Sequence, residues 1–184
     1  MDESNKELYF AKADITSVEL SDNEIKGNKA KDLSLLPIVD LPMGGMKISP
    51  SEILNSLETT DIGQSALEYL EKKGLVAKLK FGEISGTERG KQVGDDIMIY
   101  LANCKDPLDA ACAVIHEVTH HKEDIGECIW AETVCYVQEY KHIHNKENLS
   151  IEEIKKIIRA VKKAYQEEDY NWKKGGYKNG KRFR

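Results

Sequence analysis

Apolar positions recur with two different spacings along this chain of 184 residues, and the spacings predict both helices and strands. Apolar side chains three and four residues apart predict amphipathic helices over residues 50–57, 61–73, 107–122, 127–144 and 150–165. Alternation over 75–81 and a short apolar run over 97–101 predict two strands. The pattern therefore predicts a mostly helical α+β fold, with a small β-sheet before the helix of residues 107–122.

Capping residues mark several of the predicted helix ends. Residues 49–52 read Ser-Pro-Ser-Glu, which is the arrangement of a capping box with proline in the first helical position. Ser150 and Glu153 form a second capping box. Asp106 precedes a proline and is predicted to cap the helix of residues 107–122. Gly74 is predicted to end the helix that begins at residue 61.

The two ends of the chain differ from its centre. Residues 1–48 are polar, with strand-like patterns only at 8–10 and 15–20, and form a loosely assigned N-terminal segment. Residues 173–184 carry six lysines and arginines and are predicted to be a basic flexible tail. We therefore assign one domain to residues 49–172.

Composition narrows the class of protein. Hydrophobic residues make up 40% and charged residues 32% of the chain, as in ordinary globular domains, and the net charge of -5 argues against a nucleic-acid partner. The sequence has no apolar stretch long enough to span a membrane and no N-terminal pattern of a secretory signal. We expect no membrane partner and a cytoplasmic protein as the chain is given, or a secreted one if it is the end domain of an exported protein.

The candidate chemistry lies in the segment His116-Glu117-Val118-Thr119-His120. On a helix, His116 and His120 lie one turn apart on one face, and Glu117 is one position further round. Apolar residues of the same helix form another face, which leaves the histidines away from the core. Imidazole nitrogens suit Zn²⁺, and a catalytic zinc site has three protein ligands and one open position. A third ligand is therefore required.

The chain is expected to reverse near Ile125, so the helix that follows would run back past the two histidines and could provide the third ligand. Glu132 lies as far after this reversal as the two histidines lie before it, so it is the residue most nearly level with the proposed ion in an antiparallel helix pair. A carboxylate there would complete a His-His-Glu ligand set. Glu127 lies closer to the turn and Glu139 lies about two turns further along, and both are weaker candidates.

Other residues leave alternatives open. Cys112, one turn before the first histidine of the motif, would make the site structural if it were a fourth ligand. His142 and His144 are two positions apart, which favours a surface location over metal binding. Either of them, or Tyr136, is a candidate for stabilising an oxyanion. The four cysteines form no CxxC pair and are expected to be buried thiols.

The histidine motif, followed twelve residues later by Glu132-Thr133-Val134-Cys135-Tyr136, resembles the gluzincin type of zinc metallopeptidase. The short interval, and a pattern close to E-x-x-A-Y with Cys135 in place of alanine, resemble the compact metallopeptidase domains of bacterial polymorphic toxins and phage-related proteins. The resemblance covers residues 97–140. It implies a zincin-like fold, zinc on His116, His120 and Glu132, and Glu117 as the catalytic carboxylate.

These observations lead to the hypothesis of a zinc metallopeptidase, with a protein or peptide as substrate and Glu117 as the general base. Residues 97–101 are expected to pair with an extended substrate, and residues 81–94 are expected to be either a lid or a connector. The alternative is a zinc-stabilised binding or regulatory module without turnover. A metal-free helical interaction domain is the third possibility.

Overall fold

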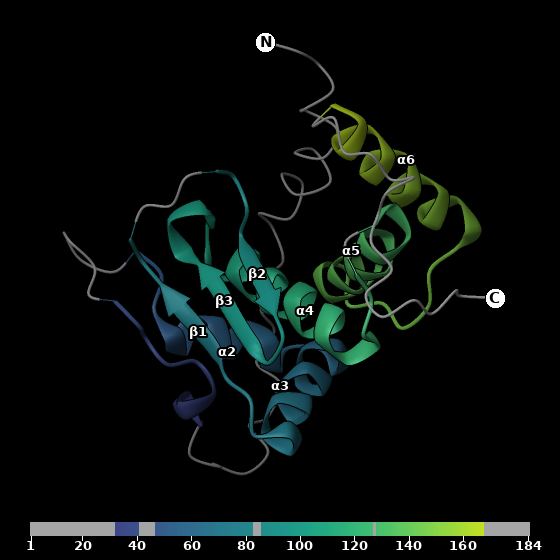
Figure 1. The fold of residues 1–184 in the computed structure, drawn as a ribbon. Helices are drawn as coiled ribbons and strands as arrows, with labels where there is room; N and C mark the ends of the chain where they lie inside the picture. Colours follow the sequence, from purple (N-terminus) through teal and green to yellow (C-terminus); the bar gives the residue numbers. More distant parts are fainter. Residues whose placement is uncertain (1–31, 41–46, 83–85, 127, 168–184) are drawn as a thin grey trace.

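The computed structural model describes residues 32–40, 47–82, 86–126 and 128–167 (Figure 1). Their elements, in chain order, are a 3₁₀ helix η1 (Leu33–Leu35), α2 (Pro50–Glu58), α3 (Asp61–Lys73), β1 (Ala77–Lys80), β2 (Gly90–Val93), β3 (Asp96–Tyr100), a 3₁₀ helix η2 (Leu101–Asn103), α4 (Pro107–Glu123), α5 (Ile129–Ile143) and α6 (Ile151–Glu167). The predicted α+β fold is confirmed. The strand-like patterns at 8–10 and 15–20 and the basic tail lie outside the described residues.

The predicted helix ends have the expected hydrogen bonds. The Ser49 hydroxyl accepts the N–H of Glu52, and the Glu52 carboxylate accepts the N–H of Ser49 at 2.8 Å, which completes the capping box of α2. Asp106 accepts the N–H of Asp109 at 2.7 Å at the start of α4. Gly74 ends α3 with a φ of 66°, a conformation that costs glycine little because it lacks a Cβ.

The three strands form one sheet in the order β1-β3-β2. Strand β1 runs parallel to β3, and β2 runs antiparallel to β3, so that β2 and β3 form a hairpin. Residues 81–94, expected to be either a lid or a connector, thus include the strand β2, which the local pattern does not predict. The short sequence Gly-Lys-Gln-Val has little apolar alternation, and only its pairing with β3 makes it a strand.

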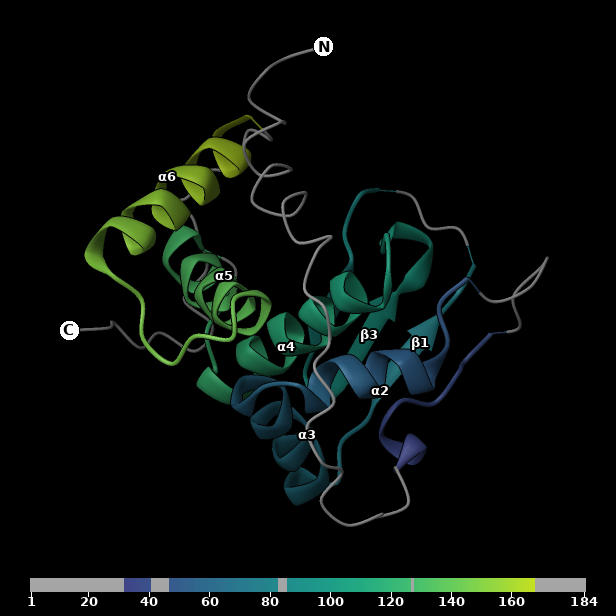
Figure 2. The same ribbon diagram turned by 180° about the vertical axis from the view of Figure 1, so that it is seen from behind.

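The helices lie mainly on one side of the sheet. Helices α2 and α4 cover one of its faces (Figure 2), while α5 packs against α4 and α6 packs against α5. Leu36, from the segment before α2, is buried in the same core, and Ile38 forms a parallel bridge with Leu79 of β1. The largest fully buried aliphatic side chains include Leu36, Ile53, Leu57, Leu70, Leu79, Ile97, Ile99 and Ile115.

Helix α4 is buried on every side. All residues from Asp109 to His120 are buried, including both histidines and Glu117 of the motif. The expectation that the histidines lie on a free face is therefore wrong. The sheet, α2, α3 and α5 all pack against α4, and a helix in this central position has nearly all of its side chains buried.

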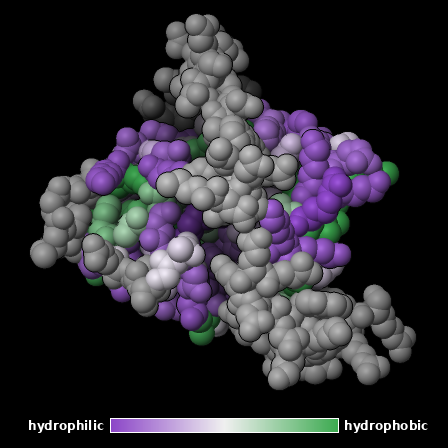
Figure 3. Space-filling view, turned by 90° about the horizontal axis from the view of Figure 1, so that it is seen from above, coloured by the Kyte–Doolittle hydropathy of each residue, from purple (hydrophilic) through white to green (hydrophobic). Residues whose placement is uncertain are grey.

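Polar residues cover most of the described surface that is visible from above (Figure 3). A few large apolar side chains are exposed, among them Val93, Trp130 and Ile151. Some exposed apolar residues are normal on a protein surface. No helix within the described ranges is both long and apolar enough to cross a membrane.

Candidate metal centre

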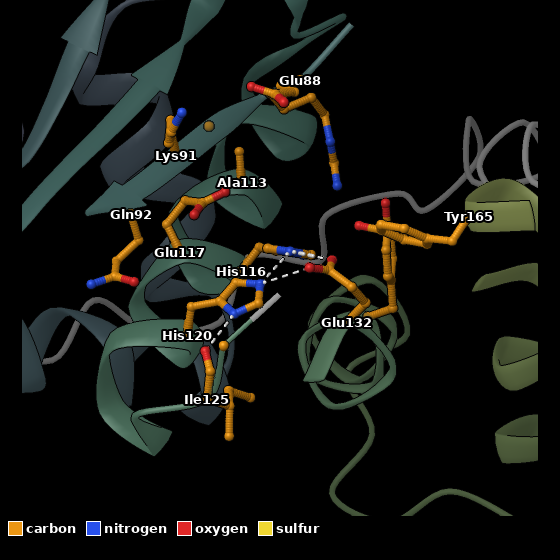
Figure 4. Close-up of a pocket in the computed structure, with 14 residues that line it drawn as sticks. Glu88, Lys91, Gln92, Ala113, His116, Glu117, His120, Ile125, Glu132 and Tyr165 are labelled. Atoms are coloured by element: carbon orange, nitrogen blue, oxygen red, sulfur yellow. Dashed lines mark hydrogen bonds and ion pairs between the residues drawn. The ribbon is translucent and has the colours of Figure 1, made fainter. Parts of the chain in front are cut away.

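Three side chains from two helices meet at one point. The Nε2 atoms of His116 and His120, one turn apart on α4, are 3.2 Å from each other. Glu132 in the first turn of α5 places Oε2 at 3.2 Å from Nε2 of His116 and Oε1 at 3.3 Å from Nε2 of His120 (Figure 4). The reversal argument thus selected the carboxylate that the structure brings to both histidines.

The turn between α4 and α5 produces this meeting. Asp124 ends α4 in the left-handed region with a φ of 47°, and the buried Ile125 follows it. Cys128 then caps α5, where its sulphur accepts the N–H of Ala131. Because the chain turns back within so few residues, Glu132 faces the last turns of α4. The weaker candidate Glu127 lies outside the described residues.

The other ring nitrogen of each histidine, Nδ1, also has a hydrogen-bond partner. Nδ1 of His116 lies 2.7 Å from Oε1 of Glu139, and Nδ1 of His120 lies 3.4 Å from the carbonyl oxygen of Ile125. Since a carbonyl and an ionised carboxylate can only accept, both Nδ1 atoms carry the hydrogen and donate it. Both Nε2 atoms of the neutral rings therefore present lone pairs, as in histidines that ligate a metal.

Lone pairs and a carboxylate crowded together need a cation. Two Nε2 lone pairs and the Glu132 oxygens lie within 3.3 Å of each other with no hydrogen among them if the rings are neutral. In the metal-free protein a proton fills this role. Burial disfavours the charged ring, but hydrogen bonds to Glu132 and Glu139 outweigh it and raise the pKa of His116 to about 10.

The spacing of these atoms also suits zinc. Ligands about 2.0–2.1 Å from a tetrahedral ion lie about 3.3 Å from one another. The two Nε2 atoms lie 3.2 Å apart, and each lies 3.2 or 3.3 Å from a different carboxylate oxygen of Glu132. Although burial opposes ionisation of Glu132, hydrogen bonds from the two histidines lower the pKa of its carboxyl, which keeps the carboxylate available as a ligand. The residues present therefore fit a zinc ion.

A buried ionic network contacts the Nδ1 side of His116, opposite the Nε2 atom that faces Glu132. Arg89 donates from one nitrogen to both oxygens of Glu139 at 2.8 Å, and from another to Asp109 at 2.7 Å. Glu139 in turn accepts from His116. The structure thus uses Glu139, a weaker candidate ligand, as the partner that orients a histidine. Sequence reasoning missed Arg89, because nothing local distinguishes a buried arginine in a glycine-rich segment from an exposed one.

Glu117 lies on the other side of the histidines, beside β2. A Cβ added to Gly90 of β2 would lie 2.8 Å from Cγ and 2.9 Å from Oε1 of Glu117, so a glycine is needed where strand and carboxylate approach. Burial raises the pKa of Glu117, an effect that the nearby histidines partly offset. A carboxylate with a raised pKa is a better proton acceptor, as a general base requires.

A cavity of about 330 Å³ opens onto these residues. Tyr165 of α6 lines it from across the site (Figure 4). The rest of its wall includes residues 88–92, His116, Glu117, His120, Glu132 and Tyr136. Strand β3, which contains most of the range expected to bind substrate, is central in the sheet and pairs with strands on both edges. The prediction that 97–101 binds substrate by edge pairing is therefore wrong, and β2 is the strand at the cavity.

The remaining candidates separate into two groups. Tyr136 lines the cavity, with its ring 5.1 Å from that of His116. His142 and His144 do not line it. His142 is only 2% exposed and bonds to Thr60 at 2.6 Å, so the expected surface location is wrong for this residue. His142 is buried because α5 packs against α3, and Thr60 caps the start of α3.

The cysteine near the histidines is Cys135, and not Cys112. The Cys135 sulphur and one nitrogen of each motif histidine lie within 4.8 Å of one another. Burial, followed by the charges of nearby carboxylates, raises the pKa of Cys135, so the thiol is protonated in the metal-free protein. The sequence predicted Cys135 to be a buried thiol and marked it as a departure from alanine, but did not predict its place beside the histidines. Its distance of three positions from Glu132 was the signal that places it on the same face of α5.

Comparisons of the chain with models of protein families, with curated proteins and with solved structures found no match.

Proposed function

We propose that this protein is a zinc-dependent peptidase. The observation that supports this most is the convergence of two Nε2 lone pairs and the Glu132 carboxylate within 3.3 Å, next to the buried carboxylate of Glu117 in an open cavity. These are the parts that metal-assisted hydrolysis needs: a ligand set, a base and space for a substrate.

His116, His120 and Glu132 would hold the ion. Zn²⁺, when bound, makes a coordinated water more acidic and polarises the carbonyl to be attacked. Glu117 accepts the proton of the attacking water and then delivers it to the leaving amine. The outer network matters too, because Glu139 and the Ile125 carbonyl hold the imidazole rings in the tautomer that leaves Nε2 available.

Tyr136 is suited to stabilise the oxyanion. It lies in the cavity wall beside His116. Burial, followed by the charge of Glu139, raises the pKa of Tyr136, so its hydroxyl stays protonated and able to donate a hydrogen bond. A donor next to the reacting carbonyl stabilises the charge that develops on its oxygen.

The substrate is proposed to be an extended peptide. Among the described strands, β2 pairs with β3 on one side and lies at the end of the sheet on the other. Gly90, Lys91 and Gln92 of β2 also line the cavity. An added peptide strand would find unpaired backbone groups along β2 and would pass beside Glu117.

The test replaces Glu117 by glutamine. Glu117→Gln removes the base and keeps its size, so cleavage of a proteome-derived peptide library should fall by about 100-fold or more. Zinc content, measured by mass spectrometry of the purified protein, should stay at one equivalent. Glu123→Gln at the exposed end of the same helix is the matched control and should leave both values unchanged.

Two results would count against the proposal. A chain without bound zinc that has no cleavage activity would remove its basis. A zinc-bound chain that performs its cellular function equally well with Glu117→Gln would instead be a non-catalytic zinc module.

A further inference from the structure

Cys135 lies where a fourth metal ligand would lie. It is one turn after Glu132 on α5, and it is fully buried. Its sulphur and the nitrogens of His116 and His120 lie within 4.8 Å of one another. It packs with Ile125 and Ala131 and does not line the cavity, so the sulphur faces the histidines from the protein interior.

Two facing helices thus present four donor atoms of the types that bind zinc. Helix α4 contributes two nitrogens four positions apart, and α5 contributes an oxygen and a sulphur three positions apart. In a tetrahedral zinc site a thiolate sulphur lies about 3.6 Å from an imidazole ligand nitrogen, given bond lengths of about 2.3 and 2.0–2.1 Å. The Cys135 sulphur lies within 4.8 Å of one nitrogen of each histidine, so coordination requires it to move closer to the ion.

We propose that Cys135 is a fourth ligand of the ion held by His116, His120 and Glu132, and that its thiolate closes the resting site. The inference rests on the proposed function, since it requires the ion at that place. Coordination breaks the S–H bond and forms a sulphur–metal bond, and the proton leaves for bulk water. A site with four protein ligands has no open position. For peptide hydrolysis a water molecule would have to displace the sulphur, which would take up a proton and become a thiol again, so Cys135 holds the enzyme in an inactive state.

Cobalt substitution tests the inference without an activity measurement. Co²⁺ occupies zinc sites, and a thiolate ligand gives it an intense near-ultraviolet charge-transfer band that nitrogen and oxygen ligands do not give. The full chain loaded with one equivalent of Co²⁺ is expected to show this band. Cys135→Ala and Cys135→Ser are both expected to lose the band while they still bind one equivalent.

The controls separate the other causes of a lost band. Cys112→Ala removes the other buried cysteine, which lies on α4, and should keep the band. Far-ultraviolet circular dichroism of each variant verifies that it is folded, and Cys135→Ser preserves the size of the side chain if alanine disturbs packing. Cleavage of peptides by the zinc form of Cys135→Ala should be faster than by the original chain.

The possible failures are distinguishable. Stoichiometric cobalt that depends on His116 but shows no charge-transfer band overturns the role of Cys135 and leaves the proposed peptidase site intact. A band that persists in both Cys135 variants has the same consequence. A chain that binds no cobalt or zinc overturns both the inference and the proposed function.

Discussion

At the scale of single residues, the role of each side chain near the centre depends on a neighbour that is distant in sequence. Glu132 and Glu139 are both buried glutamates on α5. One lies at the two Nε2 atoms, whereas the other lies behind His116 and pairs with Arg89. Spacing from the chain reversal separates Glu132 from Glu139 as the candidate ligand, but it does not predict that Glu139 lies between His116 and Arg89, because Arg89 is distant in the sequence.

Gly90 is predicted to control the position of Glu117. In Gly90→Ala the new methyl group would lie 2.8 Å from Cγ of Glu117 and 3.0 Å from the carbonyl oxygen of Met98, so the carboxylate must move. A displacement of about 1 Å at a catalytic group costs roughly 100-fold in rate, and we expect a loss of that size in kcat. Peptide cleavage kinetics and zinc content measure it.

Val93→Ala, at an exposed position of the same strand, is the matched control and should cleave normally. Zinc content should not change in either variant, because neither touches a ligand. Unchanged kcat in Gly90→Ala would show that the position of Glu117 does not limit the reaction.

At the scale of helices and strands, packing between elements had more influence on exposure and on strand formation than the local sequence pattern had. The motif helix was expected to have one solvated side, but α5 covers that side and leaves only the cavity. The hairpin strand β2 depends on pairing with β3. Helix α5 is held at its far end by the contact between His142 and Thr60, which also caps α3.

This contact predicts a pH dependence of stability. Burial lowers the pKa of His142 to about 4, whereas a histidine in an unfolded chain titrates near 6.5. As the pH falls below about 6.5 the unfolded chain takes up a proton that the folded protein does not, so stability is lost until about pH 4. Between pH 7.5 and pH 5, this residue should cost the metal-free protein about 1–2 kcal/mol.

Urea unfolding at both pH values measures the effect. His142→Gln has no group that titrates there, so its free energy of unfolding should fall by less than that of the original chain over the same interval. If the two proteins lose the same free energy on acidification, His142 is not the group responsible.

At the scale of the whole molecule, the proposed ion would join α4 to α5 and so link the sheet layer to the two C-terminal helices. An ion that binds only the folded state adds about 2.7 kcal/mol when its free concentration is 100 times Kd. Removal of zinc by a chelator should therefore lower the midpoint of thermal unfolding by several degrees, and added zinc should restore it.

Differential scanning calorimetry with and without chelator measures this shift. His116→Ala removes one ligand, so its unfolding midpoint should be insensitive to chelator. A chelator effect of equal size in this variant would place the stabilising ion elsewhere.

The helices, their capped ends and the candidate ligands His116, His120 and Glu132 could be predicted from the sequence, because they depend on the spacing of a few residues and on one short turn. Only the tertiary contacts established which strand borders the cavity, that Arg89 and Glu139 support His116, and that His142 is buried. These features depend on packing between segments far apart in the chain, and no local pattern of residues specifies such contacts.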